Sequence, residues 1–140
     1  MDFNRFLEAQ NSAFDRARSE LTAGAKISHW MWFIFPQLGA LGHSSLAKYY
    51  GIETLADARD YIAHPDLGPR LIELTGIVLG HRNKSAHAIF GSPDDLKFRS
   101  SMTLFALAAP QRPEFRQAAE VFYGEPDQRT LDLLGVDWPA

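Results

Sequence analysis

Cysteine is absent from the 140-residue chain, and this removes several kinds of chemistry at once. Without a thiol there is no disulfide, no cysteine nucleophile, no zinc–thiolate site and no thiol redox switch. The histidines also lack the i, i+4 spacing that places two metal ligands on one helical face. We therefore expect no metal site, and the sequence specifies no cofactor. The histidines are His29, His43, His64, His81 and His87.

Concentrated positive charge is also missing. The formal net charge is −3, the sequence pI is about 5.9, and no run of Lys and Arg is longer than two residues. Binding to nucleic acid draws much of its affinity from phosphate neutralisation and counterion release, which needs clustered basic side chains. We therefore do not expect a nucleic-acid partner.

Long hydrophobic runs are lacking as well. The first ten residues, "MDFNRFLEAQ", are polar and acidic, which differs from the basic and then apolar pattern of a signal peptide. The longest apolar run is much shorter than the roughly 20 residues of a membrane-spanning helix. These features predict a cytoplasmic protein with no membrane partner.

Strand-like alternation is absent too, and helical periodicity takes its place. Apolar residues recur every three or four positions between about residues 2 and 21, which is typical of an amphipathic helix. Gln10 falls within this stripe and is either a structural tie or a pocket residue, with the tie favoured because a buried polar group needs a partner. The stripe consists of Phe3, Phe6, Leu7, Phe14, Ala17 and Leu21.

Capping signals divide the rest of the chain into short helices. Thr54 opens a capping box, Ser92 precedes a proline at a first helical position, and Asp127 begins a last helix that ends at Gly135. Pro113 starts another helix, which Gly124 closes. These signals predict a mainly α protein, a single compact domain over residues 1–140 with six or seven short helices.

Two segments are harder to assign. We interpret residues 64–68 as a turn that precedes a helix over residues 69–78, because Pro65 and Pro69 suit only a first helical turn. The stretch "SAHAIFG" is too short to assign by periodicity, and we interpret it as extended.

The most conspicuous stretch is "HWMWFIFPQ", residues 29–37, which contains six large apolar side chains in a row. Periodicity cannot distinguish helix from strand in such a run, and the simplest interpretation is hydrophobic core. If the run is extended, Trp30 and Trp32 lie on one face and form a stacking wall for a planar ligand. His29 and Gln37 then bracket this wall with polar groups, His29 as an acid–base candidate and Gln37 as a ligand-binding one.

A second candidate site lies in "GSPDDLKFRSSMTLF". Asp94, Lys97 and Ser101 are three and four residues apart and share one helical face, and Ser100 lies on its edge. A helix N-terminus with a nearby lysine and hydroxyl groups suits an anion or a phosphate. The alternative is a capped helix with a surface Asp–Lys pair that contributes a few tenths of a kcal/mol.

The segment "HPDLGPRL" offers a third candidate, Arg70. Its guanidinium could hold a carboxylate or phosphate through two hydrogen bonds, or it could tie the turn to neighbouring carbonyl groups. The known catalytic signatures are missing: the Ser45–Lys48 match to S-x-x-K has no companion motif, and there is no G-x-S-x-G, P-loop or dinucleotide fingerprint.

Several of these segments together resemble the family known as domain of unknown function 1810, whose members are sometimes mislabelled calpastatin. The resemblance spans nearly the whole chain and is carried by "HWMWFIFPQ", "LGHSSLAKYYGI", "HPDLGPRL", "IFGSPDDLKFRSSMTLF" and the closing "FYGEPDQRTLDLL". It implies a compact, mainly helical domain and assigns no catalytic residue. The C-terminal half has a weaker likeness to the NADAR superfamily, which is associated with ADP-ribose and N-glycosidic bonds.

Two functional hypotheses follow. In the first, the tryptophans and the Lys97 helix face one pocket that binds a small, planar, anionic ligand such as a nucleotide or an ADP-ribose derivative. This pocket could belong to an enzyme, with His29, Asp94 and Lys97 as catalytic candidates. In the second, the chain is a non-catalytic interaction module whose polar residues only cap helices and tie the core. The first hypothesis assigns ligand binding to Trp30, Trp32, Gln37, Arg70, Ser100 and Ser101.

Overall fold

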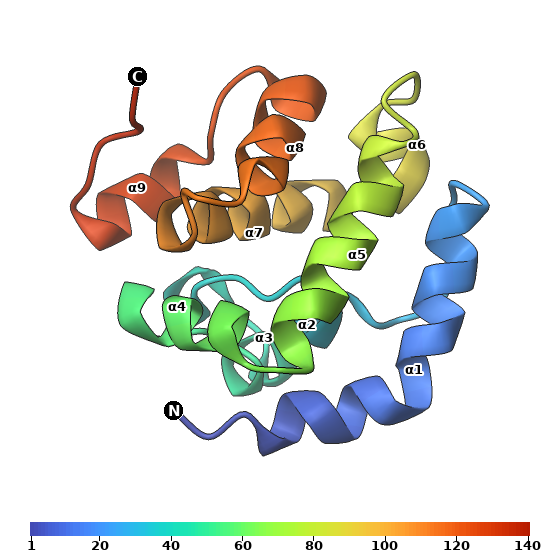
Figure 1. Cartoon of the computed structure of the whole chain (residues 1–140), viewed down its shortest axis with the longest axis horizontal. Helices are drawn as coiled ribbons and strands as arrows, with labels where there is room; N and C mark the ends of the chain where they lie inside the picture. Colours follow the sequence, from blue (N-terminus) through green and yellow to red (C-terminus); the bar gives the residue numbers. More distant parts are fainter.

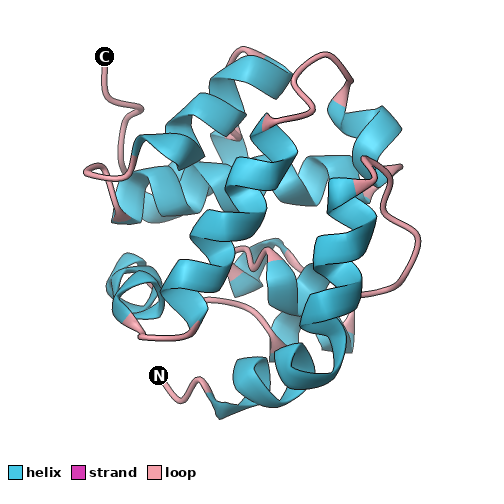
Figure 2. Cartoon of the chain, turned by 45° about the vertical axis from the view of Figure 1, so that its right-hand side comes forward, coloured by secondary structure: helices cyan, strands magenta, loops and turns pink.

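The chain folds into nine α-helices and one 3₁₀ turn, with no β-strand (Figures 1 and 2). The computed structural model describes all 140 residues. A single parallel bridge joins Leu38 to Ile52. The predicted mainly α fold is therefore confirmed. The elements are α1 (Asn4–Thr22), α2 (Met31–Ile34), η1 (Gly39–Leu41), α3 (Ser45–Tyr49), α4 (Leu55–Ala63), α5 (Leu67–Leu79), α6 (Ala86–Phe90), α7 (Asp94–Ala108), α8 (Pro113–Tyr123) and α9 (Gln128–Leu134).

Helix α7 is the centre of the packing. It contacts α4, α6, α8 and α9, and most of its residues from Phe98 onwards are buried. Helix α5 packs against α1, α4 and α8. In Figure 1, α1 and α9 lie at opposite sides of the molecule. This arrangement lets the two ends of α7 reach different surfaces, and its N-terminal turns border the cleft described below.

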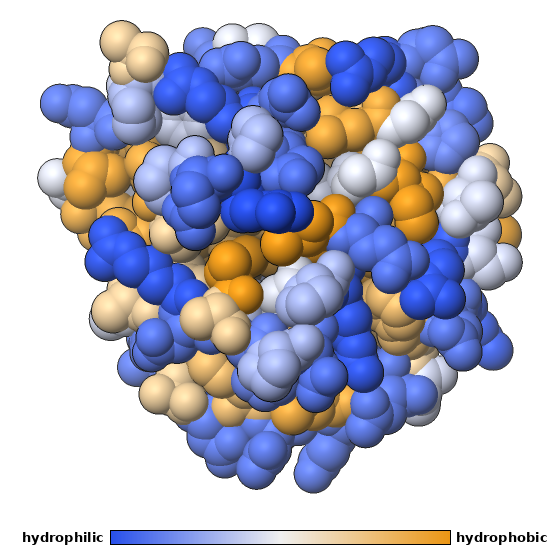
Figure 3. All heavy atoms as spheres, viewed as in Figure 1, coloured by the Kyte–Doolittle hydropathy of each residue, from blue (hydrophilic) through white to orange (hydrophobic).

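Aromatic side chains fill much of the core. Phe90 and Phe98 stack with their ring centroids 4.6 Å apart, and Phe35 meets Phe98 edge-on at 5.0 Å. Phe105 links α7 to Tyr61 of α4 and to Phe115 of α8. Large exposed apolar residues are scattered, and the face in Figure 3 is mostly hydrophilic, with hydrophobic atoms visible between the polar ones.

Gln10 is a buried tie between α1 and three other segments, which was the favoured interpretation of its place in the apolar stripe. Its amide nitrogen donates to the carbonyl of Phe33 at 2.7 Å and to the hydroxyl of Tyr61 at 3.0 Å. Its amide oxygen accepts from Arg70 at 3.3 Å. These bonds join α1 to α2, α4 and α5 and satisfy a polar group that would be costly to bury alone.

Several predicted helix ends are confirmed by their hydrogen bonds. The hydroxyl of Thr54 accepts from the amide of Asp57, and the carboxylate of Asp127 accepts from the amide of Thr130. Pro113 occupies the first turn of α8, and Gly124 ends that helix in the left-handed conformation. Thr54 and Asp127 supply an acceptor for a free N–H, Pro113 has no N–H that could be left unpaired, and Gly124 has no Cβ to oppose the left-handed backbone.

Other local predictions were wrong. The segment "SAHAIFG" forms α6 and is not extended, because Ser85 accepts a hydrogen bond from the amide of Ala88 and nucleates a helical turn. With α2, this short helix raises the count from the expected six or seven helices to nine. Ser92 does not cap α7, which begins at Asp94 with Pro93 in the N-cap position.

Helix α5 also begins earlier than predicted, at Leu67 and not at Pro69. The ring nitrogen Nδ1 of His64 accepts from the amides of Asp66 and Leu67, at 3.1 and 3.2 Å. The His64 side chain therefore satisfies two amides at the start of α5, within the segment that we expected to be only a turn.

Candidate functional site

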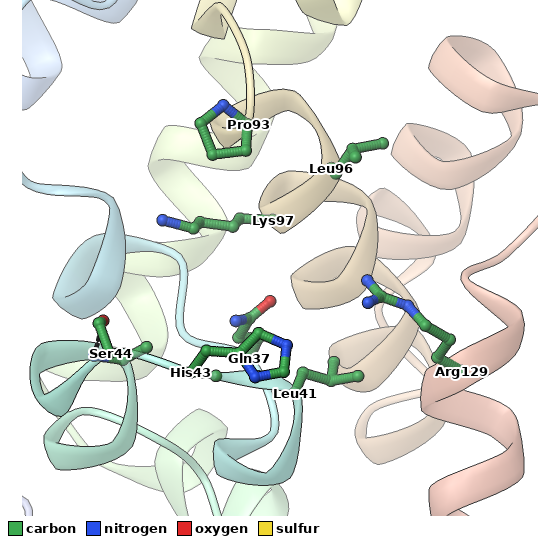
Figure 4. Close-up of a pocket in the computed structure, with 10 residues that line it drawn as sticks. Gln37, Leu41, His43, Ser44, Pro93, Leu96, Lys97 and Arg129 are labelled. Carbon is green, nitrogen blue, oxygen red and sulfur yellow. Dashed lines mark hydrogen bonds between the residues drawn. The ribbon is translucent and has the colours of Figure 1, made fainter.

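A cleft of about 300 Å³ opens between the η1–α3 segment and the first turns of α7, with α9 at one side (Figure 4). Its walls come from three parts of the sequence that lie tens of residues apart. The lining side chains include two cations, one imidazole, one hydroxyl and one amide, but no carboxylate. They are Gln37, Leu41, Gly42, His43, Ser44, Ala47, Pro93, Leu96, Lys97 and Arg129.

The η1–α3 wall is held by backbone contacts. The amide of Ile52 donates to the carbonyl of Gln37, and the amide of Gly39 donates to the carbonyl of Ile52, both at 2.9 Å. A Cβ added to Gly51 would lie 2.3 Å from the Cα of Gly39, so the two chain segments approach as closely as only glycine permits. This contact places Gln37 at the inner end of the cleft (Figure 4).

Ser44 caps the short helix of the same wall. Its hydroxyl accepts from the amide of Ala47 at 3.1 Å, which fixes the turn that carries His43 and Ser44. Both residues are exposed, and in Figure 4 they lie across the cleft from Lys97. An imidazole and a hydroxyl therefore face the cleft without being tied into the core.

Lys97 forms the α7 side of the cleft, and its ammonium group is only weakly neutralised. Its Nζ atom lies 3.5 Å from Oδ1 of Asp94, whereas Lys26 lies 2.7 Å from Oδ2 of the same carboxylate. The Lys26 side chain is only 6% exposed, so its pair with Asp94 is the tighter one. Two lysines therefore share one carboxylate, which leaves about one net positive charge at the cleft.

Arg129 on α9 provides the second cation. Its only nearby acid is Asp127, with 3.7 Å between Nε of Arg129 and Oδ1. The other oxygen of Asp127 accepts from the amide and the hydroxyl of Thr130. The guanidinium side chain is 63% exposed and reaches toward the cleft from the side opposite Ser44 (Figure 4).

A smaller hollow adjoins the cleft behind Lys97, and we call it the tryptophan recess. It has room of about 10 Å³ and shares Gln37, Ala47 and Lys97 with the cleft. Lys97 Nζ lies 5.0 Å from the ring centre of Trp32, a cation–π distance. The indole nitrogen of Trp32 is buried and has no hydrogen-bond partner. The remaining lining residues are Met31, Trp32, Phe35 and Tyr50.

Burial also affects the tyrosine of the recess. Removal from water raises the pKa of Tyr50, and the neighbouring Tyr49 and Glu8 add to this effect, which Arg5 opposes. The phenol of Tyr50 is therefore neutral at physiological pH and can act as a hydrogen-bond donor.

Three of the residues proposed from the sequence come together here. Trp32 lines the recess, while Gln37 and Lys97 line both hollows. The run around Trp32 is a helical turn and not an extended strand, so the two tryptophans do not share a face. Trp30 is buried in the core, and its indole nitrogen donates to Glu20 at 3.0 Å.

The other proposed residues lie outside the cleft. His29 is exposed and lines neither hollow, and Arg70 hydrogen-bonds to Gln10 on the side formed by α1 and α5. Asp94 faces two lysines and does not line the cleft. Ser100 and Ser101 are buried within α7: the first donates to the carbonyl of Leu96, and the second has no hydrogen-bond partner.

His43, Ser44 and Arg129 line the cleft, yet sequence reasoning did not select them. His43 and Ser44 stand next to each other in the glycine-rich stretch "LGHSSLAKYYGI", and a polar pair in a glycine-rich turn was the available signal. Arg129 carried no signal of its own, because only the packing of α9 brings it to α7.

The fold and the cleft define a small all-helical domain with a polar, cation-lined surface cleft. The chain belongs to the family described as "Protein of unknown function (DUF1810)", whose model matches residues 1–134. It is similar to the crystal structure of the conserved hypothetical protein Rv1873 from Mycobacterium tuberculosis. The two chains are 48% identical, the match covers 97% of this chain and 98% of the other, and the TM-score is 0.94.

A search of curated proteins gave no match. The comparisons support neither a link to calpastatin nor the weaker likeness to the NADAR superfamily. None of the helices combines the length and apolar character needed to cross a bilayer. No three His, Asp or Glu side chains converge in the geometry of a metal site.

Proposed function

We propose that this protein binds a small anionic metabolite of the nucleotide type in the cleft. The observation that carries the proposal is the pair of cations Lys97 and Arg129, which come from two helices to a cleft that no carboxylate lines. In a protein with an overall negative charge, such a concentration of positive potential attracts anions selectively.

The polar groups of the cleft suit a phosphate or a carboxylate. Lys97 and Arg129 would meet the negative charge, and His43 and Ser44 would donate hydrogen bonds from the opposite wall. The cleft volume of about 300 Å³ stands at the lower end of the range of about 300–1,000 Å³ typical of small-molecule sites. This size favours a mononucleotide over a complete ADP-ribose.

This proposal replaces some of the roles suggested by the sequence. Lys97 keeps a binding role, while Asp94 holds Lys26 and Lys97 in place. His43 takes the position in the cleft that we had expected for His29. The alternative, a non-catalytic interaction module, assigns the polar residues only to helix caps and core ties. Lys97 and Arg129 line the cleft and neither cap a helix nor tie the core, which supports ligand binding over that alternative.

A thermal-shift experiment tests the proposal. We expect AMP to raise the melting temperature of the wild-type protein by several degrees, since a ligand at 100 times its Kd adds about 2.7 kcal/mol of stability. Lys97→Ala should abolish this shift and leave the melting temperature of the free protein within a few degrees of the wild type.

The control is Lys48→Ala, which removes the same charge from an exposed residue of α3 that lines neither hollow. It should retain the full shift. An unchanged shift in Lys97→Ala would overturn the proposal. So would the absence of any shift with AMP, ADP-ribose, ribose 5-phosphate or inorganic phosphate.

A further inference from the structure

We propose that the tryptophan recess is a second subsite of the cleft, and that it takes the aromatic ring of a ligand whose phosphate group binds Lys97 and Arg129. This inference rests on the proposed function and identifies the ligand class more closely, as a phosphate monoester that carries a planar ring. The reasons are the composition of the recess, an unpartnered donor within it and the position of Lys97.

The recess is suited to a flat, apolar group. Met31, Trp32, Phe35 and Tyr50 supply thioether and aromatic surfaces, and Gln37, Lys97 and the indole N–H of Trp32 add polar groups. Aromatic rings gain from offset and edge-on contacts with each other, and methionine packs favourably against them. The cleft has the opposite character, because its side chains are mainly polar or charged. The two hollows together therefore match the two ends of a ring-bearing phosphate.

Trp32 provides a donor that the protein itself does not use. Its indole nitrogen is buried and has no hydrogen-bond partner, although a buried N–H without a partner costs free energy. The indole nitrogen of Trp30, by contrast, has a hydrogen-bond partner, because it donates to Glu20. A ring nitrogen or carbonyl oxygen on the ligand would satisfy Trp32. The recess therefore favours a heteroaromatic ring with an acceptor on its edge.

The side chain of Lys97 lies between the cleft and the recess. It lines both of them, and its ammonium group lies above Trp32 while remaining 3.5 Å from Asp94. The side chain is 24% exposed, has four rotatable carbon–carbon bonds and competes for Asp94 with the closer Lys26. Its present contacts are therefore weak ones, and a phosphate in the cleft would compete with them effectively.

The size of the recess makes the two binding events depend on each other. Its volume of about 10 Å³ is about enough for one water molecule and far too small for a ring. A ring can enter only after Lys97 leaves the face of Trp32. Because the phosphate draws Lys97 into the cleft, phosphate binding opens the recess, and the ring then covers the exposed indole.

Tryptophan fluorescence tests this inference. We expect AMP to bind at least tenfold more tightly than ribose 5-phosphate, which carries the same phosphate without the ring. AMP should also lower the quenching of tryptophan emission by acrylamide, because its ring covers Trp32. Ribose 5-phosphate should leave this quenching unchanged or raise it, because Lys97 moves away and nothing replaces it.

Two variants assign the signal to Trp32. In Trp32→Phe the effect of AMP on quenching should disappear, and the preference for AMP over ribose 5-phosphate should fall because the N–H donor is gone. Trp138→Phe is the matched control, since Trp138 packs against Arg116 and lines neither the cleft nor the recess. It should respond to AMP as the wild type does.

The outcomes separate the two proposals. If AMP and ribose 5-phosphate bind equally well and AMP leaves acrylamide quenching unchanged, the ring subsite is wrong and the anion site stands. If AMP lowers acrylamide quenching in the wild type and Trp138→Phe, and lowers it equally in Trp32→Phe, the ring binds elsewhere. The proposed ring subsite is then also wrong. If none of the phosphates binds, both proposals fail.

Discussion

A single residue, Glu20, holds several groups of the loop between α1 and α2. Its carboxylate, near the end of α1, accepts hydrogen bonds from the amides of Ile27 and Ser28, the hydroxyl of Ser28 and the indole of Trp30, at 2.6 to 3.0 Å. Partial burial raises the pKa of Glu20, but the bonds from Ser28, Ile27 and Trp30 outweigh it and lower the pKa to about 2. One ionised side chain therefore holds the part of the loop that directly precedes α2, from Ile27 to Trp30.

The pH dependence of stability should reveal this role. The folded-state pKa of Glu20 is lower than the ordinary value of 4.5, so the carboxylate stabilises the fold above pH 4.5. That stabilisation declines as the pH falls from 4.5 toward 2. At pH 7 we expect Glu20→Gln to lower the free energy of unfolding by about 1–2 kcal/mol, after allowance for solvent screening.

Urea unfolding at pH 7, 4 and 2.5 measures this effect. The difference between wild type and Glu20→Gln should shrink steadily toward the lowest pH. Glu53→Gln is the control, because Glu53 is exposed and forms no ion pair. A difference that stays constant over the whole range would contradict the assigned pKa.

At the scale of elements, the wall formed by residues 37–52 is the least regular part of the fold and the one that shapes the cleft. A 3₁₀ turn, a five-residue helix and one parallel bridge replace the long helices found elsewhere. Hydrogen bonds between Gln37, Gly39 and Ile52 hold it, and the close approach of Gly39 and Gly51 permits them. The stability of this wall and the shape of the cleft should therefore change together.

Gly51→Ala tests that connection. The added Cβ would lie 2.3 Å from the Cα of Gly39 and 2.9 Å from its amide nitrogen, so the wall must move. We expect the free energy of unfolding to fall by about 1–3 kcal/mol and AMP affinity to fall with it.

Gly76→Ala is the matched control. Gly76 is exposed within α5, and a Cβ there meets nothing within 4 Å. It should stabilise the protein by about 0.5–1 kcal/mol, since alanine is the better helix former, and leave AMP binding unchanged. If both variants bind AMP like the wild type, the wall does not control the cleft.

At the scale of the whole molecule, aromatic packing around α7 joins the helices into one core. Phe105 lies 5.4 Å from Tyr61 and 5.8 Å from Phe115, measured between ring centroids, and it is fully buried. Three helices, α4, α7 and α8, therefore meet at one side chain. The cleft borders the first turns of α7, whereas Phe105 lies near the other end of the helix, so we expect core stability and ligand binding to be separable.

Phe105→Ala should lower the free energy of unfolding by about 3–5 kcal/mol, because it leaves a cavity that neighbouring rings cannot fill. Phe105→Leu conserves more volume and should cost less than half as much. Urea unfolding measures both values. Under conditions where Phe105→Ala remains folded, its AMP affinity should equal that of the wild type, and a selective loss of affinity would contradict the separation of core and cleft.

Local rules account for the parts of the fold that the sequence predicted correctly. Thr54, Pro113 and Asp127 act on residues within one helical turn, so their neighbours in the sequence are also their neighbours in space. Ser92 was misread because the same residue types permit helix starts that differ by one or two residues. The segment "SAHAIFG" was misread because its helix has only five residues, too few to show a helical periodicity. For Gln10 we favoured a tie over a pocket residue because a buried polar residue within an apolar stripe must find a partner, and its hydrogen bonds show the tie.

The candidate site was only partly predictable. Lys97, Gln37 and Trp32 stood out because polar or amphipathic side chains lay beside apolar runs, and they do line the hollows. Trp30 carried the same signal, but the helical turn at Met31–Ile34 directs it into the core. Arg129 could not be found, because its contact with the cleft depends on how α9 packs against α7.

By itself, the sequence determined the helical class, the single domain, most helix ends and the absence of thiol chemistry. These properties depend on composition and on interactions within a few residues. Only the tertiary structure decided which polar groups meet: it turned Trp30 inward, tied Arg70 to Gln10, and brought His43 and Arg129 to Lys97. The physical reason is that a cleft is formed by side chains distant in sequence, whose meeting depends on the packing of the whole core.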